Sequence, residues 1–192
     1  DHSQALPELQ HAHDAKLCRV CGHELTYERA FVGHLGHYHC ESCGMRRPEP
    51  DISATAITLR GMSGLEATIE SPEGKSRLEL PLPGLYNLYN ALGAIATARQ
   101  LGVPVGEAVA SLAEMKAVFG RVERIEIEGV SLSILLIKNP AGANEVIRTL
   151  ALEPAPIDLW VALNDRIAYG RDVSWIWDAD FEMLAERVGR IT

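Results

Sequence analysis

Cys18-Arg19-Val20-Cys21 and Cys40-Glu41-Ser42-Cys43 contain all four cysteines of the chain. The spacing is C-x2-C-x18-C-x2-C, and a glycine follows each pair, at Gly22 and Gly44. Zinc favours four thiolates at tetrahedral corners, and a C-x2-C turn followed by glycine directs two thiolates toward one ion. The spacing therefore predicts a closed, structural zinc site with four ligands: Cys18, Cys21, Cys40 and Cys43.

Two other uses of these cysteines compete with a metal site. A pair of disulfides is disfavoured in a reducing compartment, and two glycine-followed copies in one short segment favour a metal over a redox pair. All seven histidines precede Cys40 and could compete as ligands. Because four thiolates complete the set, we expect the neighbouring histidines to be exposed polar residues of the ribbon: His23, His34, His37 and His39.

Composition excludes several classes of protein. The chain has 192 residues, 47% hydrophobic and 23% charged, which suits one domain or two small ones rather than a disordered chain. A net charge of -8 without a basic run argues against nucleic-acid binding. No apolar stretch approaches the roughly 20 residues of a membrane span, and the N-terminus lacks signal-peptide features, so we expect a cytoplasmic protein without a transmembrane segment. Because the chain lacks an initiator Met, we expect an excised fragment.

Alternating and helical patterns predict the elements after Pro50. Short alternating runs punctuated by glycine and proline predict antiparallel strands at 55–59, 65–69 and 78–80. Apolar residues at helical spacing then predict two helices. The first carries Ala91, Ala94, Ile95, Ala98 and Leu101 on its apolar face, and the second spans 105–112.

A second unit is expected from about Phe119. An alternating strand at 122–127 is followed by apolar runs at 132–137 and 157–163, which flank a helix over 143–150. Strand, helix and strand in this order predict a right-handed parallel crossover. Ligands of such sheets bind beyond the carboxyl ends of the strands, here at residues 138–142 and 164–172. A last helix is expected to carry Phe181, Leu184, Ala185 and Val188 on one face.

Four segments in one order carry a family resemblance. Residues 84–92, 119–123, 138–142 and 164–178, together with the four-cysteine ribbon, resemble the MurT family, the Mur-ligase-like subunits of lipid II isoglutaminyl synthase. Asn-x-x-Asn and Gly-Arg are shared with Mur ligases in general, whereas the ribbon and residues 171–178 are specific to this family.

The resemblance implies an α/β, Mur-ligase-like fold: the end of a central domain with an inserted four-cysteine zinc ribbon, then part of a Rossmann-like C-terminal domain. We expect the boundaries at 1–16 for a linker and the end of the central-domain strand region, 17–47 for the ribbon, 48–117 for the rest of the central domain, and 118–192 for the truncated C-terminal domain.

The family also implies a reaction. It is the ATP-dependent amidation of the D-glutamate α-carboxylate of lipid II to D-isoglutamine, in peptidoglycan biosynthesis at the inner face of the membrane. The carboxylate is activated as an acyl phosphate, because phosphorylation turns its oxygen into a leaving group that ammonia can displace. Mg²⁺ offsets the phosphate charge. The ammonia comes from glutamine through a partner glutaminase, GatD.

Three residues match the family's nucleotide site. Asn90 matches the asparagine that faces the nucleotide, and Asn87 either helps from one helical turn earlier or caps the helix. Arg121 matches the arginine of the Gly-Arg linker, with a solvated surface arginine as the alternative. Lys138-Asn139-Pro140 stands where relatives carry a His-Asn-Pro-like loop, but Leu135 replaces their aspartate.

Asp172 matches the family aspartate that completes the glutaminase's catalytic machinery across the subunit interface. A carboxylate beside a Cys–His pair orients and stabilises an imidazolium. The alternative for Asp172 is a turn aspartate that binds its own backbone. Asp165 is a second candidate, whereas Asp178 and Asp180 precede the final helix and are expected to cap it. Tyr169 replaces an aspartate that the family often has there.

The sequence contains no G-x-x-x-x-G-K-[ST] phosphate loop, so we expect the chain alone not to hydrolyse ATP. Two other functions are considered: a noncatalytic zinc-ribbon module that binds a protein, and another Mur or folylpolyglutamate-type ligase. The three tryptophans are expected in the core or at a subunit contact: Trp160, Trp175 and Trp177.

Overall fold

The computed structural model describes residues 2–10, 14–115, 121–154, 156–164, 166 and 172–191. A short helix, η1 (His2–Gln4), precedes the ribbon. The largest sheet is antiparallel, in the order β3 (Ser53–Leu59), β4 (Leu65–Ser71) and β5 (Gly74–Leu80), with the turn η2 (Gly61–Ser63) between the first two. Leu65, Ala67 and Ile69 alternate with half-buried residues and point into the core. The antiparallel strands predicted here are confirmed.

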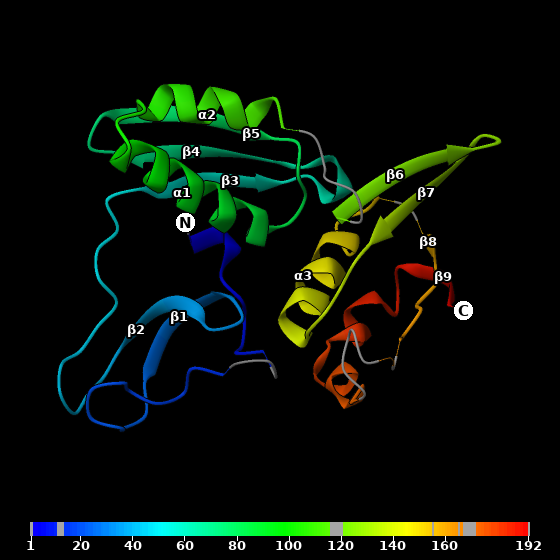
Figure 1. Ribbon diagram of the computed structural model, residues 1–192. Helices are drawn as coiled ribbons and strands as arrows, with labels where there is room; N and C mark the ends of the chain where they lie inside the picture. The colour runs from blue at the N-terminus through cyan, green and yellow to red at the C-terminus, as the bar shows by residue number, and fades with distance from the viewer. Residues whose placement is uncertain are drawn as a thin grey trace.

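Two helices pack on this sheet and close its core (Figure 1). They are α1 (Leu85–Gln100) and α2 (Val105–Ala113). Their buried residues join those of the sheet in one cluster: Leu88, Ala91, Ile95, Val105 and Val109 from the helices, with Ile69 and Leu78 from the strands. Two expectations for the first helix are wrong: Ala94 is exposed, and Leu101 is 80% exposed just beyond the last turn.

Helix α1 begins earlier than its apolar spacing predicts. Its N-cap is Gly84, whose φ of 86° lies in the left-handed region that glycine tolerates. Asn87 is therefore inside the first turn, and the prediction that it caps the helix is wrong. Its Nδ2 instead donates to the carbonyl oxygen of Pro83 at 2.7 Å.

The ribbon is a hairpin of β1 (Thr26–Val32) and β2 (Leu35–His39) that lies on the other side of α1 from the large sheet (Figure 1). The rings of Tyr27 and Tyr38, paired across the two strands, are 5.6 Å apart. Gly36 has no room for a side chain, because a Cβ there would collide with the backbone oxygen of Arg29. The hairpin is therefore closely packed despite its small size.

The C-terminal unit consists of small sheets around one helix. β6 (Arg121–Ile127) pairs antiparallel with β7 (Val130–Leu135), and α3 (Pro140–Leu150) follows. β8 (Ile157–Leu159) pairs parallel with β9 (Val188–Ile191), and between them lie the 3-10 helices η4 (Ser174–Asp178) and η5 (Phe181–Leu184).

Two predictions for this unit are wrong. Among the described residues β7 and β8 do not pair, so they form no parallel crossover; a turn at Glu128-Gly129, with φ of 50° and 83°, folds β7 back on β6. The expected last helix is only the single turn η5, because Val188 joins β9 and the carbonyl oxygen of Arg187 accepts a hydrogen bond from Ile157 N at 2.9 Å.

Helix α3 contacts both the ribbon and the large sheet's unit. Arg148 Nη1 donates to the carbonyl oxygen of Phe31 in β1 at 2.6 Å. Glu153, just past the helix, accepts a hydrogen bond from Met62 N in η2 at 2.7 Å. Within its own unit, α3 packs Ala143, Ile147 and Leu150 in a second core cluster.

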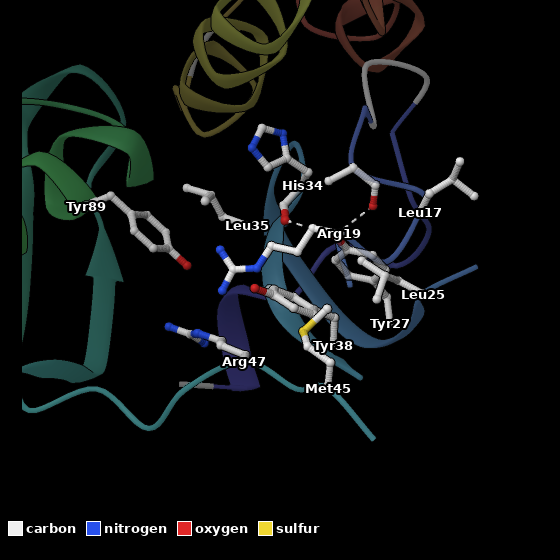
Figure 2. A pocket seen from close by; sticks show the side chains of 12 residues that line it. Leu17, Arg19, Leu25, Tyr27, His34, Leu35, Tyr38, Met45, Arg47 and Tyr89 are labelled. Atoms are coloured by element: carbon white, nitrogen blue, oxygen red, sulfur yellow. Dashed lines mark hydrogen bonds between the residues drawn. The ribbon is translucent and has the colours of Figure 1, made fainter. Parts of the chain in front are cut away.

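A cavity of about 290 Å³ lies between the ribbon and α1 (Figure 2). Tyr89 closes it from the helix side, whereas the other lining residues come from the ribbon and the segments beside it. Within the described part of the chain, no helix has the length and apolarity to span a membrane.

Candidate functional site

The two cysteine pairs sit in turns with the same hydrogen bonds. Cys18 N donates to His23 O at 2.7 Å, and Gly22 N donates to Cys18 O at 2.8 Å. In the second turn, Cys40 N donates to Met45 O at 2.7 Å and Gly44 N to Cys40 O at 2.9 Å. Gly22 and Gly44 have φ of 74° and 72°, which explains the glycine after each pair.

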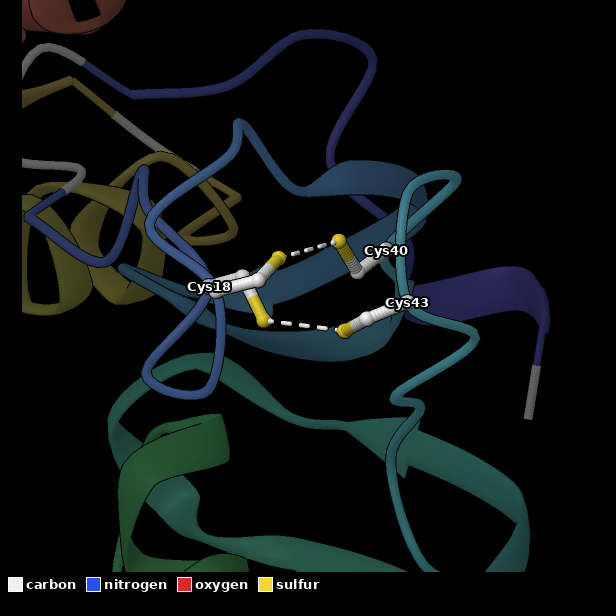
Figure 3. A group of neighbouring side chains, drawn as sticks. Cys18, Cys40 and Cys43 are labelled. Carbon is white, nitrogen blue, oxygen red and sulfur yellow. Dashed lines mark hydrogen bonds between the residues drawn. The ribbon is translucent and has the colours of Figure 1, made fainter.

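These turns bring the four sulfur atoms together (Figure 3). All four Sγ atoms lie within 4.8 Å of one another, with 3.6 Å between Cys18 and Cys43 and 3.5 Å between Cys21 and Cys40. Tetrahedral zinc with Zn–S bonds of about 2.3 Å places its sulfur ligands about 3.8 Å apart. The cysteines are free rather than disulfide-bonded, and the cluster is consistent with a zinc site.

The thiols differ in acidity. Burial disfavours the Cys18 thiolate, but the N–H groups of Cys21 and Val20 and the thiols of Cys43 and Cys21 together lower its pKa to about 6. At Cys43 the N–H of Met45 favours the thiolate, yet contacts with the other three sulfur atoms and burial raise the pKa to about 12. Cys43 is therefore a neutral thiol at neutral pH in the absence of a metal, and binding of a zinc ion by its thiolate would release that proton.

The histidines beside the cluster do not join it. The metal-binding group found among the described residues consists of the four cysteines alone. His39 Nε2 instead lies 2.8 Å from Glu41 Oε1, and its Nδ1 lies 3.4 Å from Glu28 Oε1. His23, His34 and His37 are exposed, as expected, whereas the expectation is wrong for His39, which is half-buried.

The two asparagines matched to the nucleotide site lie on neighbouring turns of α1. Asn90 is exposed, and its Nδ2 donates to Asn87 Oδ1 at 3.4 Å. Since Asn87 is already bound to Pro83 O, Asn90 has the more accessible amide. Arg121 begins β6, where its backbone is opposite Leu135.

Asp172 is exposed and lies just before η4. Its Oδ1 accepts a hydrogen bond from Ser174 N at 2.9 Å. The hydroxyl and the N–H of Ser174 lower the pKa of Asp172, so the group is a carboxylate at neutral pH. This is the local turn contact considered as the alternative for this residue, and the outer face of the carboxylate is still open to solvent.

The other candidate carboxylates are placed as follows. Asp165 lies outside the described residues, as does Tyr169. Asp178 is exposed at the end of η4 and is not the N-cap of the next turn; that position belongs to Asp180, whose side chain makes no capping hydrogen bond. The predicted capping role of Asp178 is therefore wrong.

The loop before α3 is a helix cap. Asn139 is the N-cap, its Oδ1 accepts a hydrogen bond from Gly142 N at 2.8 Å, and Pro140 occupies the first turn. Asparagine at the cap and proline in the first turn are both common helix-start residues.

Sequence reasoning missed two groups of residues. Glu145 and Arg148, an i,i+3 pair on α3, form a buried ion pair at 2.9 Å, and their helical spacing was a usable signal. Arg19 and Arg47 line the cavity of Figure 2 with Tyr89. No local sequence pattern predicts that Arg19, Arg47 and Tyr89 lie together, because Tyr89 comes from α1 and the arginines come from the ribbon.

Comparisons with known proteins agree with this geometry. The family model described as MurT ligase C-terminal matches residues 136–192. The lipid II isoglutaminyl synthase (glutamine-hydrolyzing) subunit MurT of Streptococcus pneumoniae is 39% identical over 88% of this chain and 37% of its own length. The subunit of the same name from Staphylococcus aureus is 31% identical over 91% of this chain and 38% of its length.

Solved structures give the same fold. A pseudomurein peptide ligase type C from Methanothermus fervidus superposes with a TM-score of 0.70 at 25% identity, over 96% of this chain and 39% of that one. MurF from Acinetobacter baumannii gives 0.53 at 25% identity, over 57% of this chain and 24% of its own. The chain spans less than two fifths of the length of the MurT relatives. Over that span, the chain belongs to the MurT-type, Mur-ligase-like proteins.

Proposed function

We propose that the protein to which this chain belongs catalyses the ATP-dependent amidation of the D-glutamate α-carboxylate of lipid II, using ammonia from a GatD-type glutaminase subunit. The observation that carries the proposal is 39% identity, over 88% of the chain, to a subunit named for the glutamine-hydrolysing synthesis of lipid II isoglutamine. The four-cysteine cluster supports it, because the same resemblance includes a ribbon of this kind.

Each site residue has a role in this proposal. ATP supplies the phosphoryl group that turns a carboxylate oxygen into a leaving group. Asn90 offers an exposed amide toward the nucleotide from α1, and Arg121, at the start of β6, is the other residue that the resemblance assigns to the nucleotide, with Mg²⁺ offsetting the phosphate charge. The four cysteines hold a structural zinc ion that fixes the ribbon.

Asp172 acts on the partner rather than on lipid II. Its exposed carboxylate, held by Ser174, is ionised at neutral pH and is free to approach a second protein. In the proposed complex it accepts a hydrogen bond from the imidazole of the glutaminase's Cys–His pair and stabilises the imidazolium.

The test compares two sources of ammonia in the full-length protein with its glutaminase. Asp172→Asn keeps the size of the side chain and one acceptor oxygen for Ser174 N, but it replaces the other oxygen by an NH2 donor and removes the charge. We expect glutamine-driven amidation of lipid II to fall about 10⁴-fold, as for the third member of a triad, while amidation driven by free ammonia persists. Asp178→Asn, an exposed aspartate of the same segment, is the matched control and should leave both rates unchanged.

Two outcomes would count against the proposal. Equal losses with glutamine and with free ammonia would place Asp172 outside the glutaminase reaction. No amidation of lipid II by the wild-type pair would remove the proposed reaction itself and leave a zinc-ribbon binding module as the better account.

A further inference from the structure

The cavity between the ribbon and α1 combines cationic, hydroxyl and apolar side chains (Figure 2). Arg19 lies in the first cysteine turn of the ribbon, and Arg47 follows the second turn. Tyr89 from α1 faces both arginines across the cavity. The ribbon also supplies apolar walls: Leu17, Leu25, Leu35 and Met45. A volume of about 290 Å³ approaches the lower end of the range for small-molecule sites, about 300 Å³.

Both arginines lack an acidic partner among the described residues, and no carboxylate is among the described residues that line the cavity. Arg60, Arg77, Arg99, Arg124 and Arg148 each form an ion pair with a glutamate. Across the same described ranges, no such pair includes Arg19 or Arg47. Two unpaired guanidinium groups at one cavity, in a chain of net charge -8, favour an anion as the ligand.

Tyrosine hydroxyls add donors beside the guanidinium groups. The Tyr27 hydroxyl already has partners within the protein, because it lies 3.0 Å from Ala15 O and 3.3 Å from His34 O, either of which can accept its single proton. The Tyr27 ring also packs against the ring of Tyr38. The hydroxyls of Tyr38 and Tyr89 have no hydrogen bond within the described part of the chain. Burial raises the pKa of Tyr89, although Arg47 opposes the shift, so this hydroxyl is a proton donor at neutral pH.

The hollow next to the cavity carries charges of both signs. His37, Arg47 and Glu49 line it, and burial together with the charges of Arg47 and Arg29 lowers the pKa of His37, whereas Glu28 opposes the shift. An anion is therefore favoured at the cavity itself, where the described lining residues include both arginines and no carboxylate.

We propose that this cavity binds a phosphoryl or diphosphoryl group attached to an organic moiety. Guanidinium groups bind phosphate oxygens through paired hydrogen bonds, and a phosphate has more acceptor oxygens than a carboxylate to satisfy two guanidinium groups and two hydroxyls. The leucines and Met45 form an apolar wall that an organic group attached to the phosphate can contact. Free phosphate has no apolar part to make this contact. This class of ligand follows from the cavity and not from the proposed amidation.

Two sources could present this chemistry: a lipid-linked diphosphate or a nucleotide. The probes are therefore geranyl diphosphate, ADP and inorganic pyrophosphate, titrated by calorimetry into the zinc-loaded, full-length protein. We expect Arg19→Ala and Arg47→Ala each to weaken binding at this cavity about 10–100-fold, the usual loss for a hydrogen-bonded charged group. Tyr89→Phe should weaken it less, because it removes one hydroxyl and keeps the ring.

Arg46→Ala is the matched control, because Arg46 is exposed on the same ribbon and does not line this cavity. Zinc content checks that each variant keeps its ribbon. A loss seen only with geranyl diphosphate assigns the cavity to a lipid-linked diphosphate, and a loss seen only with ADP assigns it to a nucleotide. The inference is overturned when none of the probes binds, or when the Arg19 and Arg47 variants bind all of them as tightly as the wild type.

Discussion

Glu145 is the only acidic or basic side chain that is buried in the described part of the chain, at 2% exposure. Its carboxylate accepts hydrogen bonds from Arg148 Nη1 at 2.9 Å and from the backbone N–H of Tyr86. Tyr86 lies in the first turn of α1, where unpaired N–H groups attract negative charge. One carboxylate thus links α3 to the start of α1, the helix that carries Asn87 and Asn90.

Loss of this carboxylate should destabilise the fold. In Glu145→Ala, the guanidinium of Arg148, only 15% exposed, loses its ion-pair partner. Breaking a buried pair from one side costs about 3–5 kcal/mol, so we expect a fall of that size in the free energy of unfolding, measured with urea. Glu126→Ala, which removes an exposed partner of Arg124, should change it by less than about 1 kcal/mol. Similar losses in the two variants would contradict the assignment.

The same residue predicts a pH dependence. Burial raises the pKa of Glu145, although Arg148 and the Tyr86 N–H oppose the shift. Between the ordinary carboxyl pKa of about 4.3 and the raised value, the folded state holds a proton that the unfolded state has lost. The free energy of unfolding should therefore decrease as pH rises through this window, and Glu145→Gln should remove that component. Parallel pH curves for wild type and variant would show that the pKa is not raised.

At the level of the element, the ribbon has too little apolar core to fold without help. Its buried apolar residues are Ala30 and Phe31 together with Cys18 and Cys40. Units below about 40 residues usually need a metal or disulfides, and here the thiolate cluster supplies the cross-link.

Zinc removal should accordingly unfold the ribbon and spare the large sheet. We expect Cys18→Ser, or treatment with a chelator, to abolish zinc binding and to lose hydrogen-exchange protection at 26–39, while α1 and β4 stay protected. Ser42→Ala, between two ligands of the second turn, is the control and should retain zinc. Unchanged protection of β1 and β2 without metal would mean that the hairpin is stable by itself.

Helix α1 offers a stabilising change. Gly93 lies in its interior, and a Cβ there would meet no atom within 4 Å. Gly93→Ala should stabilise the protein by about 0.5–1 kcal/mol, because glycine is a poor helix former, and thermal unfolding would measure this. Gly36→Ala should instead destabilise the ribbon, since its Cβ would collide with Arg29. A Gly93→Ala variant no more stable than wild type would contradict the open space at this position.

Local patterns predicted the elements better than their pairing. Alternation in Leu65-Glu66-Ala67-Thr68-Ile69 and the C-x2-C-G turns encode β4 and the sulfur cluster, because each depends on neighbouring residues. The apolar runs around α3 did not reveal that β7 pairs with β6, since an apolar run does not specify its partner strand. Contacts between distant elements, such as Tyr89 with the ribbon cavity, have no signature in either segment.

At the level of the whole molecule, α3 joins the parts that carry the site residues. Arg148 hydrogen-bonds Phe31 O in β1 at 2.6 Å and Gln4 O at 3.4 Å, and Glu145 reaches the start of α1. The ribbon, the asparagines of α1 and the C-terminal unit are thus held by one short helix. A change in α3 should therefore affect the cysteine cluster and the sites proposed for the nucleotide and the partner together.

The C-terminal unit also exposes a surface suited to a partner. Trp175 packs against the second core, as expected, whereas Trp177 is 85% exposed and Trp160 79%, so a subunit contact of these two stays a prediction. Trp177 lies in η4, the turn that follows Asp172. Exposed tryptophans are frequent centres of protein interfaces, and this one adjoins the aspartate proposed to reach the glutaminase.

We expect Trp177→Ala to weaken the complex with the glutaminase subunit about 10–100-fold, because truncation of a central interface tryptophan typically costs about 2 kcal/mol or more. Affinity is measured by surface plasmon resonance with the full-length protein. Leu101→Ala, at an equally exposed apolar residue after α1, should bind as the wild type does. Glutamine-driven amidation should fall at low partner concentration and recover at saturation, which separates loss of affinity from loss of catalysis by Asp172→Asn. Unchanged affinity would place the interface away from η4 and would also weaken the case for Asp172 as the residue that reaches the partner's active site.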